Sequence, residues 1–114
     1  MPMWLMTKVG FYSIVKKEGE TRLTIRARAR QDLLNLKESY LPGLGEIEES
    51  DKRDYRYCAR VPQEVFAEAL KEMALDIDYP NFKNSVATTQ GKARAGLYGD
   101  VWVRLLDLQR EDAP

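Results

Sequence analysis

Two stretches near the start of the chain, residues 11–17 and 22–29, resemble β-strands, and in the second of them apolar and polar residues alternate. Alternation of this kind is typical of a β-strand with one buried face. A short loop from Glu18 to Glu20, with a glycine at its centre, separates the two stretches. Loops of this type join antiparallel strands, so the pattern predicts a β-hairpin.

The spacing changes at Gln31, after which apolar residues recur every three or four positions. Leu33, Leu36 and Tyr40 then share one side of a helix, with charged residues between them. The Pro-Gly pair at 42–43 ends this segment. The sequence therefore predicts an amphipathic helix of about 11 residues.

A second hairpin and a second helix follow the same plan. Residues 45–50 and 54–61 flank a charged turn at 51–53, and Pro62 stands where the first residue of a helix is expected. The apolar stripe of this helix consists of Val65, Phe66, Ala69, Leu70, Met73 and Ile77. Its regular spacing makes it the clearest helical pattern in the chain.

The two halves also resemble each other in sequence. Residues 27–34 match residues 59–66 across the expected junction of strand and helix, which indicates two ββα units at 11–41 and 45–77. One such unit cannot close a core, but two can merge into one sheet. We expect an α+β fold with a four-stranded mixed sheet, ββαββα, in a permuted ferredoxin-like arrangement with parallel central strands.

The remaining residues, 80–109, read as additional C-terminal helices. Pro80 and Asn81 can begin a short helix, and Gly91 interrupts the pattern. The next helix carries a stripe of Leu97, Val101, Leu105 and Leu108, joined by Tyr98 and Trp102. This helix either covers a second surface of the sheet or packs against another subunit. Residues 1–114 are expected to form a single domain.

Composition limits the class of protein. With 44% hydrophobic and 32% charged residues, the chain has the balance of a folded globular protein. No apolar run approaches the roughly 20 residues needed to cross a bilayer, and the first residues lack the features of a leader, so we expect a cytoplasmic protein with no membrane partner. The single cysteine, Cys58, is expected to be a buried, inert thiol.

The chain contains no histidine. Acid-base catalysis, nucleophile activation and transition-metal binding most often use this side chain, so most hydrolase and metalloenzyme templates cannot be met. Asp76 and Asp78, followed by Asn81, resemble the start of a calcium loop, but the required glycine and distal glutamate are missing. We therefore expect no catalysis, no cofactor and no metal.

Alternation along the strands places arginines on the face opposite the apolar one. The candidate binding residues on this face are Arg22, Arg26, Arg28, Arg56 and Arg60. Because Lys plus Arg equals Asp plus Glu over the whole chain, 18 against 18, a basic face must be local. In one interpretation Glu46 and Glu48, on the neighbouring strand, pair with Arg56 and Arg60 and form a charge lattice without a ligand.

Other occupants of this arginine face remain open. A protein partner or the C-terminal helix can lie on it, with Asp100 and Asp107 meeting the arginines. Nucleic acid is an alternative, with Phe11 or Tyr12 stacking on bases, although the aromatic strand motif of RNA-binding sheets is missing. A small anionic ligand is another.

A different site is expected if the protein resembles a dimeric ferredoxin-like barrel. A small-molecule or enzymatic role of that kind requires an apolar cavity between the sheet and the helices. Its lining would include Tyr12, Tyr57 and Trp102.

Several segments together resemble a family of short bacterial proteins. They are FYSIV at 11–15, RARARQDL at 26–33, DYRY at 54–57, DIDYPNFK at 76–83 and LYGDVW at 97–102. The resemblance extends over most of the chain and implies a single intact domain, but no particular mechanism. It also draws attention to a second candidate segment with Asp78, Tyr79, Asn81, Phe82 and Lys83. Here we expect Tyr79 and Phe82 to be core anchors and Asn81 to be a helix cap.

These patterns favour a non-catalytic binding or regulatory interaction module. Self-association as a homodimer, or a protein partner, is the expected mode. Nucleic-acid binding through the arginine face and small-molecule binding by a ferredoxin-like domain are the alternatives.

Overall fold

The computed structural model describes residues 1–79 and 81–111. They form two compact units, unit 1 at Met1–Asp78 and unit 2 at Tyr79–Pro114. Unit 1 holds a β-sheet with helices α1 and α2, and unit 2 holds helices α3, α4 and α5. The α+β class expected from the sequence is confirmed.

The sheet has five strands in the order β1-β2-β3-β5-β4, and every neighbouring pair is antiparallel. The strands are β1 at Met3–Met6, β2 at Phe11–Val15, β3 at Arg22–Ala27, β4 at Glu48–Glu49 and β5 at Tyr57–Pro62. The expected four-stranded mixed sheet was therefore wrong in strand number and in direction. After α1 the chain runs through β4 in the direction of β3, and the β4–β5 hairpin reverses it, so β5 meets β3 antiparallel.

The additional strand, β1, pairs with β2 through a tight turn. Trp4 lies opposite Ser13 in the register, and the Thr7 N–H donates to the Gly10 carbonyl at 2.9 Å. The strand has four residues, Met-Trp-Leu-Met, without alternation of apolar and polar types. This pattern gives no strand signal, which explains why the sequence did not predict it.

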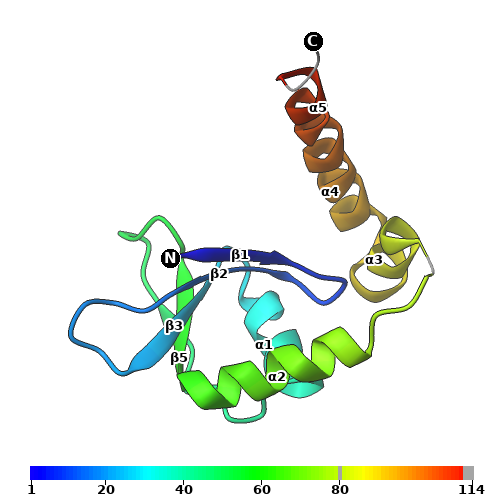
Figure 1. Cartoon of the computed structure of the whole chain (residues 1–114). Coiled ribbons are helices and arrows are strands. Elements are labelled where there is room, and N and C mark those ends of the chain that lie inside the picture. The colour runs from blue at the N-terminus through cyan, green and yellow to red at the C-terminus, as the bar shows by residue number, and fades with distance from the viewer. Residues whose placement is uncertain (80, 112–114) are drawn as a thin grey trace. The chain divides into compact units, whose positions relative to one another are not determined.

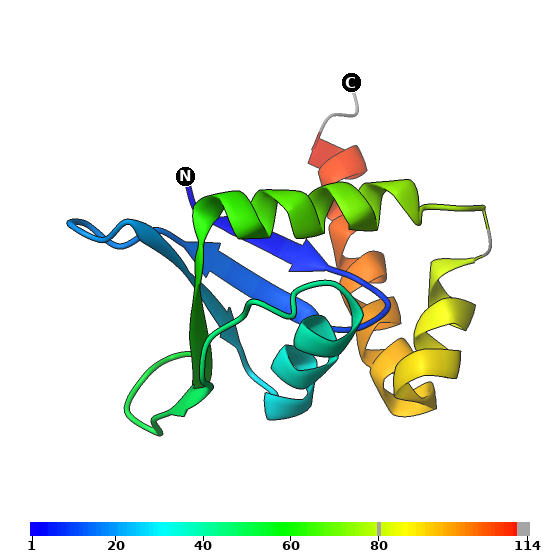
Figure 2. The same cartoon turned by 90° about the horizontal axis from the view of Figure 1, so that it is seen from below.

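Helix α1, at Arg30–Ser39, follows β2 and β3, and helix α2, at Gln63–Leu75, follows β4 and β5. The two helices lie on the same face of the sheet (Figures 1 and 2), where they cover the inward side chains of the strands. The buried core of unit 1 consists of Val9, Tyr12, Ile14, Leu23, Ile25, Ala27, Leu33, Leu36, Leu41, Leu44, Ala59, Val61, Phe66 and Ala69. Of the stripe expected on α2, Val65 is partly exposed, and Ile77 lies beyond the helix end and is exposed.

Hydrogen bonds fix the start of α1 against β2 and the preceding turn. The buried Asp32 carboxylate accepts the Phe11 N–H at 3.0 Å, and the Tyr12 hydroxyl donates to the Asp32 backbone carbonyl at 2.6 Å. One turn later, the Asn35 amide donates to the Val9 carbonyl at 3.0 Å. The ring of Tyr12 is thus packed in the core, and its hydroxyl has a hydrogen-bond partner there.

Unit 2 contains α3 at Phe82–Gln90, α4 at Lys92–Leu105 and α5 at Asp107–Glu111. Gly91 separates α3 from α4 with a φ of 96°, a conformation that other residues rarely adopt, so the predicted interruption is confirmed. Pro80, expected at the start of this region, lies outside the described residues. Across the described parts of the chain, none of the helices combines the length and apolar character that a membrane span requires.

Candidate binding surface on the open face of the sheet

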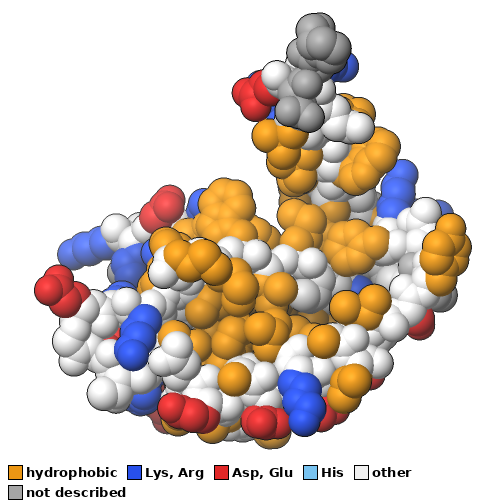
Figure 3. Space-filling view, viewed as in Figure 1, with side chains coloured by type: hydrophobic (Ala, Val, Ile, Leu, Met, Phe, Trp, Pro, Cys, Tyr) orange, Lys and Arg blue, Asp and Glu red, His pale blue; other side chains and the backbone are white. Residues whose placement is uncertain are grey.

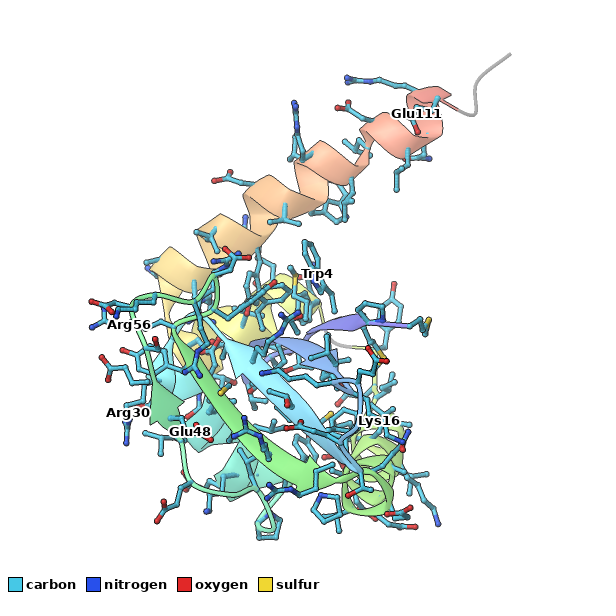
Figure 4. All side chains as sticks on the ribbon, turned by 90° about the vertical axis from the view of Figure 1, so that its left-hand side faces the viewer. Trp4, Lys16, Arg30, Glu48, Arg56 and Glu111 are labelled. Carbon is cyan, nitrogen blue, oxygen red and sulfur yellow. The ribbon has the colours of Figure 1, made fainter. Side chains whose placement is uncertain are left out.

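Within unit 1, α1 and α2 cover one face of the sheet, and we call the opposite face the open face. Figure 4 looks onto this face, with β3 and β5 foremost and Trp4 beside β1. Strand alternation brings together on it Trp4, Phe11, Ser13, Thr24, Arg26, Cys58 and Arg60. Arg26 and Arg60 therefore lie where the sequence predicted them, and Arg22 is exposed at the start of β3.

Two arginines at the β5 edge pair with glutamates of β4. The guanidinium of Arg56 donates twice to Glu49 Oε2, from Nε at 3.1 Å and from Nη2 at 2.8 Å. This hydrogen bonding, with the charges of nearby groups, raises the pKa of Arg56. Arg60 forms an ion pair with Glu48 (both Glu48 and Arg56 are labelled in Figure 4). The predicted cross-strand pairing exists, but Glu49 takes the place expected for Glu46 because β4 contains only two residues.

Two further arginines, Arg26 and Arg28, lie against Tyr55, which precedes β5 in the β4–β5 turn and folds over the sheet. The guanidinium of Arg26 lies 4.7 Å from the centre of the Tyr55 ring, and that of Arg28 lies 4.4 Å from it. Arg26 also donates to the Ser13 hydroxyl at 2.6 Å, and Arg28 donates to the Asp54 carbonyl at 3.0 Å. Cation–π stacking and these hydrogen bonds hold both side chains against the sheet.

The expectations for the second candidate segment are met in part. The Asn81 side chain accepts the backbone N–H of Lys83 at 2.8 Å, which confirms it as the cap of α3. Tyr79, expected to anchor a core, is fully exposed (100%), so that prediction was wrong. Phe82 is partly exposed and stacks on Tyr98 at 6.0 Å within unit 2. Asp78 is the last residue of unit 1 and is exposed.

A pocket of about 200 Å³ lies on the open face. It is lined by Lys17, Thr24, Arg26, Arg53, Asp54, Tyr55 and Cys58. Of this set the sequence had singled out only Arg26 as a site residue. Thr24 alternates with Arg22 and Arg26, so its face was predictable, whereas the folding of the β4–β5 turn over the sheet was not.

The cavity expected between the sheet and the helices is not found among the described residues. Tyr12 fills that space as part of the core, Tyr57 packs against the core, and Trp102 belongs to α4 in unit 2. Cys58 is a free thiol with 2% of its surface exposed, so its predicted burial is confirmed. Within residues 1–79 and 81–111, no group of three Cys, Asp or Glu side chains is arranged to hold a metal ion.

The carboxylates around the open face set its electrostatic character. Glu48, Glu49 and Asp54 lie beside the arginines and neutralise much of their charge, with Asp54 Oδ1 at 3.8 Å from Arg28 Nη1.

A scan against protein-family models, a search of curated proteins and a search of solved structures each found no match to this chain.

Proposed function

We propose that this protein is a non-catalytic interaction module that pairs with a second copy of itself through α4. The observation that carries the proposal is an apolar stripe left exposed on α4 and α5. It consists of Leu97, Val101, Leu105 and Leu108, flanked by Trp102. Trp102 is 66% exposed and Leu105 55%, and apolar side chains are seen along α4 in Figure 3.

Burial within unit 2 is small for its length. Among its described residues, only Val86, Ala95 and Tyr98 are buried. Chains below about 40 residues rarely bury enough apolar surface to be stable alone, and short helices gain most of their stability from packing. Pairing two copies of α4 supplies the missing burial.

A second copy fits this stripe better than an unrelated partner. A twofold contact uses the same surface on both copies, so each α4 buries its stripe against an identical one. Asp107, next to Leu108 of the stripe, forms ion pairs with two arginines: its carboxylate lies 2.9 Å from Arg110 Nη1 and 3.9 Å from Arg104 Nη1. The carboxylate of Asp107 therefore does not oppose the pairing of apolar side chains.

Two finer proposals concern the fold and the compartment. The strand order β2-β3-β5-β4, with α1 and α2 on one face, supports a permuted ferredoxin-like arrangement to which β1 is added. We also propose a cytoplasmic location, a reducing compartment in which the buried Cys58 would remain a thiol.

Nucleic-acid binding through the open face has less support. The carboxylates of Glu48 and Glu49 already engage arginines of this face and would repel the phosphates of a nucleic-acid strand lying across it. Because each surface pair is worth only about 0.2–1 kcal/mol, the arginines are not locked, but the net potential of the face is low.

The test is the molar mass of the full chain in solution, measured by sedimentation equilibrium over a range of concentrations. The wild-type protein is expected to form dimers. Leu105→Lys, which places a charge in the stripe, is expected to be monomeric, because the dimer would have to bury that charge. A lysine near the C-terminal end of a helix is favourable to the helix itself.

Val103→Lys is the matched control. Val103 is 57% exposed, an exposed fraction similar to that of Leu105. Because the two residues are two positions apart in the helix, their side chains lie on different sides of it. The control variant is expected to remain dimeric. A monomeric wild-type protein, or equal loss of the dimer in both variants, would show that the stripe is not a contact between copies.

A further inference from the structure

The pocket on the open face contains polar groups whose hydrogen-bonding capacity is unused. Thr24 has no exposed surface (0%), and its hydroxyl has no hydrogen-bond partner in the described part of the chain. The Nε atoms of Arg26 and Arg53, also out of contact with solvent, have no partner among the described residues either. All three side chains line the same pocket.

Such groups rarely stay unpaired in folded proteins. Leaving a buried donor without an acceptor costs the free energy of its lost hydration, and for a charged group the cost is larger. Two guanidinium N–H groups and one hydroxyl share this condition around a single pocket. An ordered water or a bound ligand that accepts hydrogen bonds can supply the missing partners.

The charge of the lining indicates the sign of that ligand. Lys17, Arg26 and Arg53 contribute three positive charges, and Asp54 contributes one negative charge. Asp54 is also close to Arg28, which lies outside the lining. The pocket is therefore cationic, although the open face around it is nearly balanced.

The volume limits the size of the ligand. Pockets for drug-sized molecules are commonly about 300–1,000 Å³, and each water occupies about 30 Å³. A pocket of about 200 Å³ is smaller than these and holds only a few waters. A volume of this size accommodates a small anion such as phosphate.

We infer that this pocket binds a small oxyanion of the phosphate type. The anion accepts hydrogen bonds from the Thr24 hydroxyl and from the guanidinium groups of Arg26 and Arg53, and Lys17 adds charge at the rim. The stacking of Arg26 on Tyr55 and its bond to Ser13 fix one of the donors in advance, which lowers the entropy cost of binding. The site lies entirely in unit 1 and does not depend on pairing through α4.

The experiment titrates inorganic phosphate into the full chain by isothermal titration calorimetry, with ionic strength held constant by sodium chloride. Wild-type protein is expected to bind phosphate saturably. Thr24→Val keeps the shape of the side chain and removes the hydroxyl, and Arg53→Gln removes one guanidinium. Each variant is expected to bind about tenfold more weakly or worse, since each loses hydrogen bonds to a charged ligand.

Arg30→Gln is the control, because it removes an exposed arginine at the start of α1 that does not line the pocket. It is expected to bind phosphate like wild type. No saturable binding by wild type would overturn the inference. Equal weakening in all three variants would also overturn it, because the effect would then be one of general surface charge.

A thermal denaturation series separates binding from folding. Without phosphate, Thr24→Val is expected to melt at or above the wild-type temperature, because the hydroxyl it removes has no partner. Added phosphate should raise the midpoint of wild type but not that of Thr24→Val. A variant that responds to phosphate as wild type does would contradict the site.

Two further samples are measured. An oligonucleotide shows whether the site prefers free phosphate or nucleic acid, and the Leu105→Lys variant shows whether phosphate binding depends on the proposed dimer contact. A single-stranded oligonucleotide is expected not to bind. Oligonucleotide binding that exceeds phosphate binding and is lost in Arg53→Gln would overturn the small-anion assignment in favour of nucleic acid. Leu105→Lys is expected to retain phosphate binding, and its loss there would contradict a site confined to unit 1.

Discussion

Gly10 lies where the turn between β1 and β2 presses against the core. A Cβ atom at this position would lie 2.7 Å from Tyr12 Cζ and 2.8 Å from Asp32 Cβ. Both distances are below those that real Cβ atoms show, and Tyr12 has no exposed surface into which to move. Gly10→Ala is therefore expected to displace the Tyr12 ring and weaken its hydrogen bond to Asp32, lowering the free energy of unfolding by about 1–3 kcal/mol.

Urea denaturation of the variant measures this loss as a lower midpoint. Gly96→Ala supplies the comparison, because a Cβ at Gly96, inside α4, would meet nothing within 4 Å. Alanine favours a helix interior over glycine, so this variant should be at least as stable as wild type. An unchanged midpoint for Gly10→Ala would mean that the turn can move away from the core.

Residue by residue, alternation in β3 and β5 was enough to assign side chains to faces. It correctly separated Ile25 and Ala59, in the core, from Arg26 and Arg60, on the open face. The contacts between the arginines and their partners were less predictable, because they depend on register. Because β4 contains only two residues, Glu49 is the glutamate that pairs with Arg56. Tyr55 contacts Arg26 and Arg28 because the β4–β5 turn folds back over the sheet.

At the scale of elements, one hydrogen bond joins the C-terminal ends of α1 and α2. The hydroxyl of Tyr40, at the end of α1, donates to the carboxylate of Asp76, at the end of α2, at 2.6 Å. This bond is the largest cause of a rise in the pKa of Tyr40 from 10.0 to about 12, with burial and the negative charge of Asp76 also contributing. The folded state thus favours the protonated tyrosine.

The sign of the pH dependence follows from that shift. A pKa raised on folding contributes stability that is complete below the unfolded value of 10.0 and disappears as the pH rises through about 12. Wild type should be more stable than Tyr40→Phe by a constant margin at neutral pH, and the margin should shrink between those two values. Urea midpoints of both proteins over this range measure it. A margin that does not change with pH would indicate that Tyr40 contributes packing rather than the hydrogen bond.

Some helices and strands could be predicted from the sequence, and others could not. Helices α1 and α2 were predicted from the regular spacing of their apolar residues, and the β2–β3 hairpin from the alternation in β3 and the glycine in its turn. β1 was missed because its four residues do not alternate. The expectation of parallel central strands failed for a topological reason, since the β4–β5 hairpin reverses the chain after the α1 crossover.

At the scale of the whole molecule, the division into two compact units predicts that unit 1 folds on its own and that unit 2 does not. Unit 1 contains the large core around Tyr12 and Ile25, whereas the described residues of unit 2 bury only Val86, Ala95 and Tyr98. A chain that ends after Asp78 is therefore expected to unfold in one cooperative transition, as small domains with a single core do. Residues 79–114 alone are expected to lose most of their helical content on dilution, because they fall below the size that usually folds unaided.

Circular dichroism of the two fragments, followed by urea unfolding of residues 1–78, measures both expectations. The longer fragment should also be monomeric and should still bind phosphate, because it lacks α4 but retains every residue that lines the pocket. A dimer formed by residues 1–78 would place the contact between copies outside α4. A gradual, non-cooperative transition would show that the core of unit 1 is not sufficient for folding, so the two units would have to fold as one.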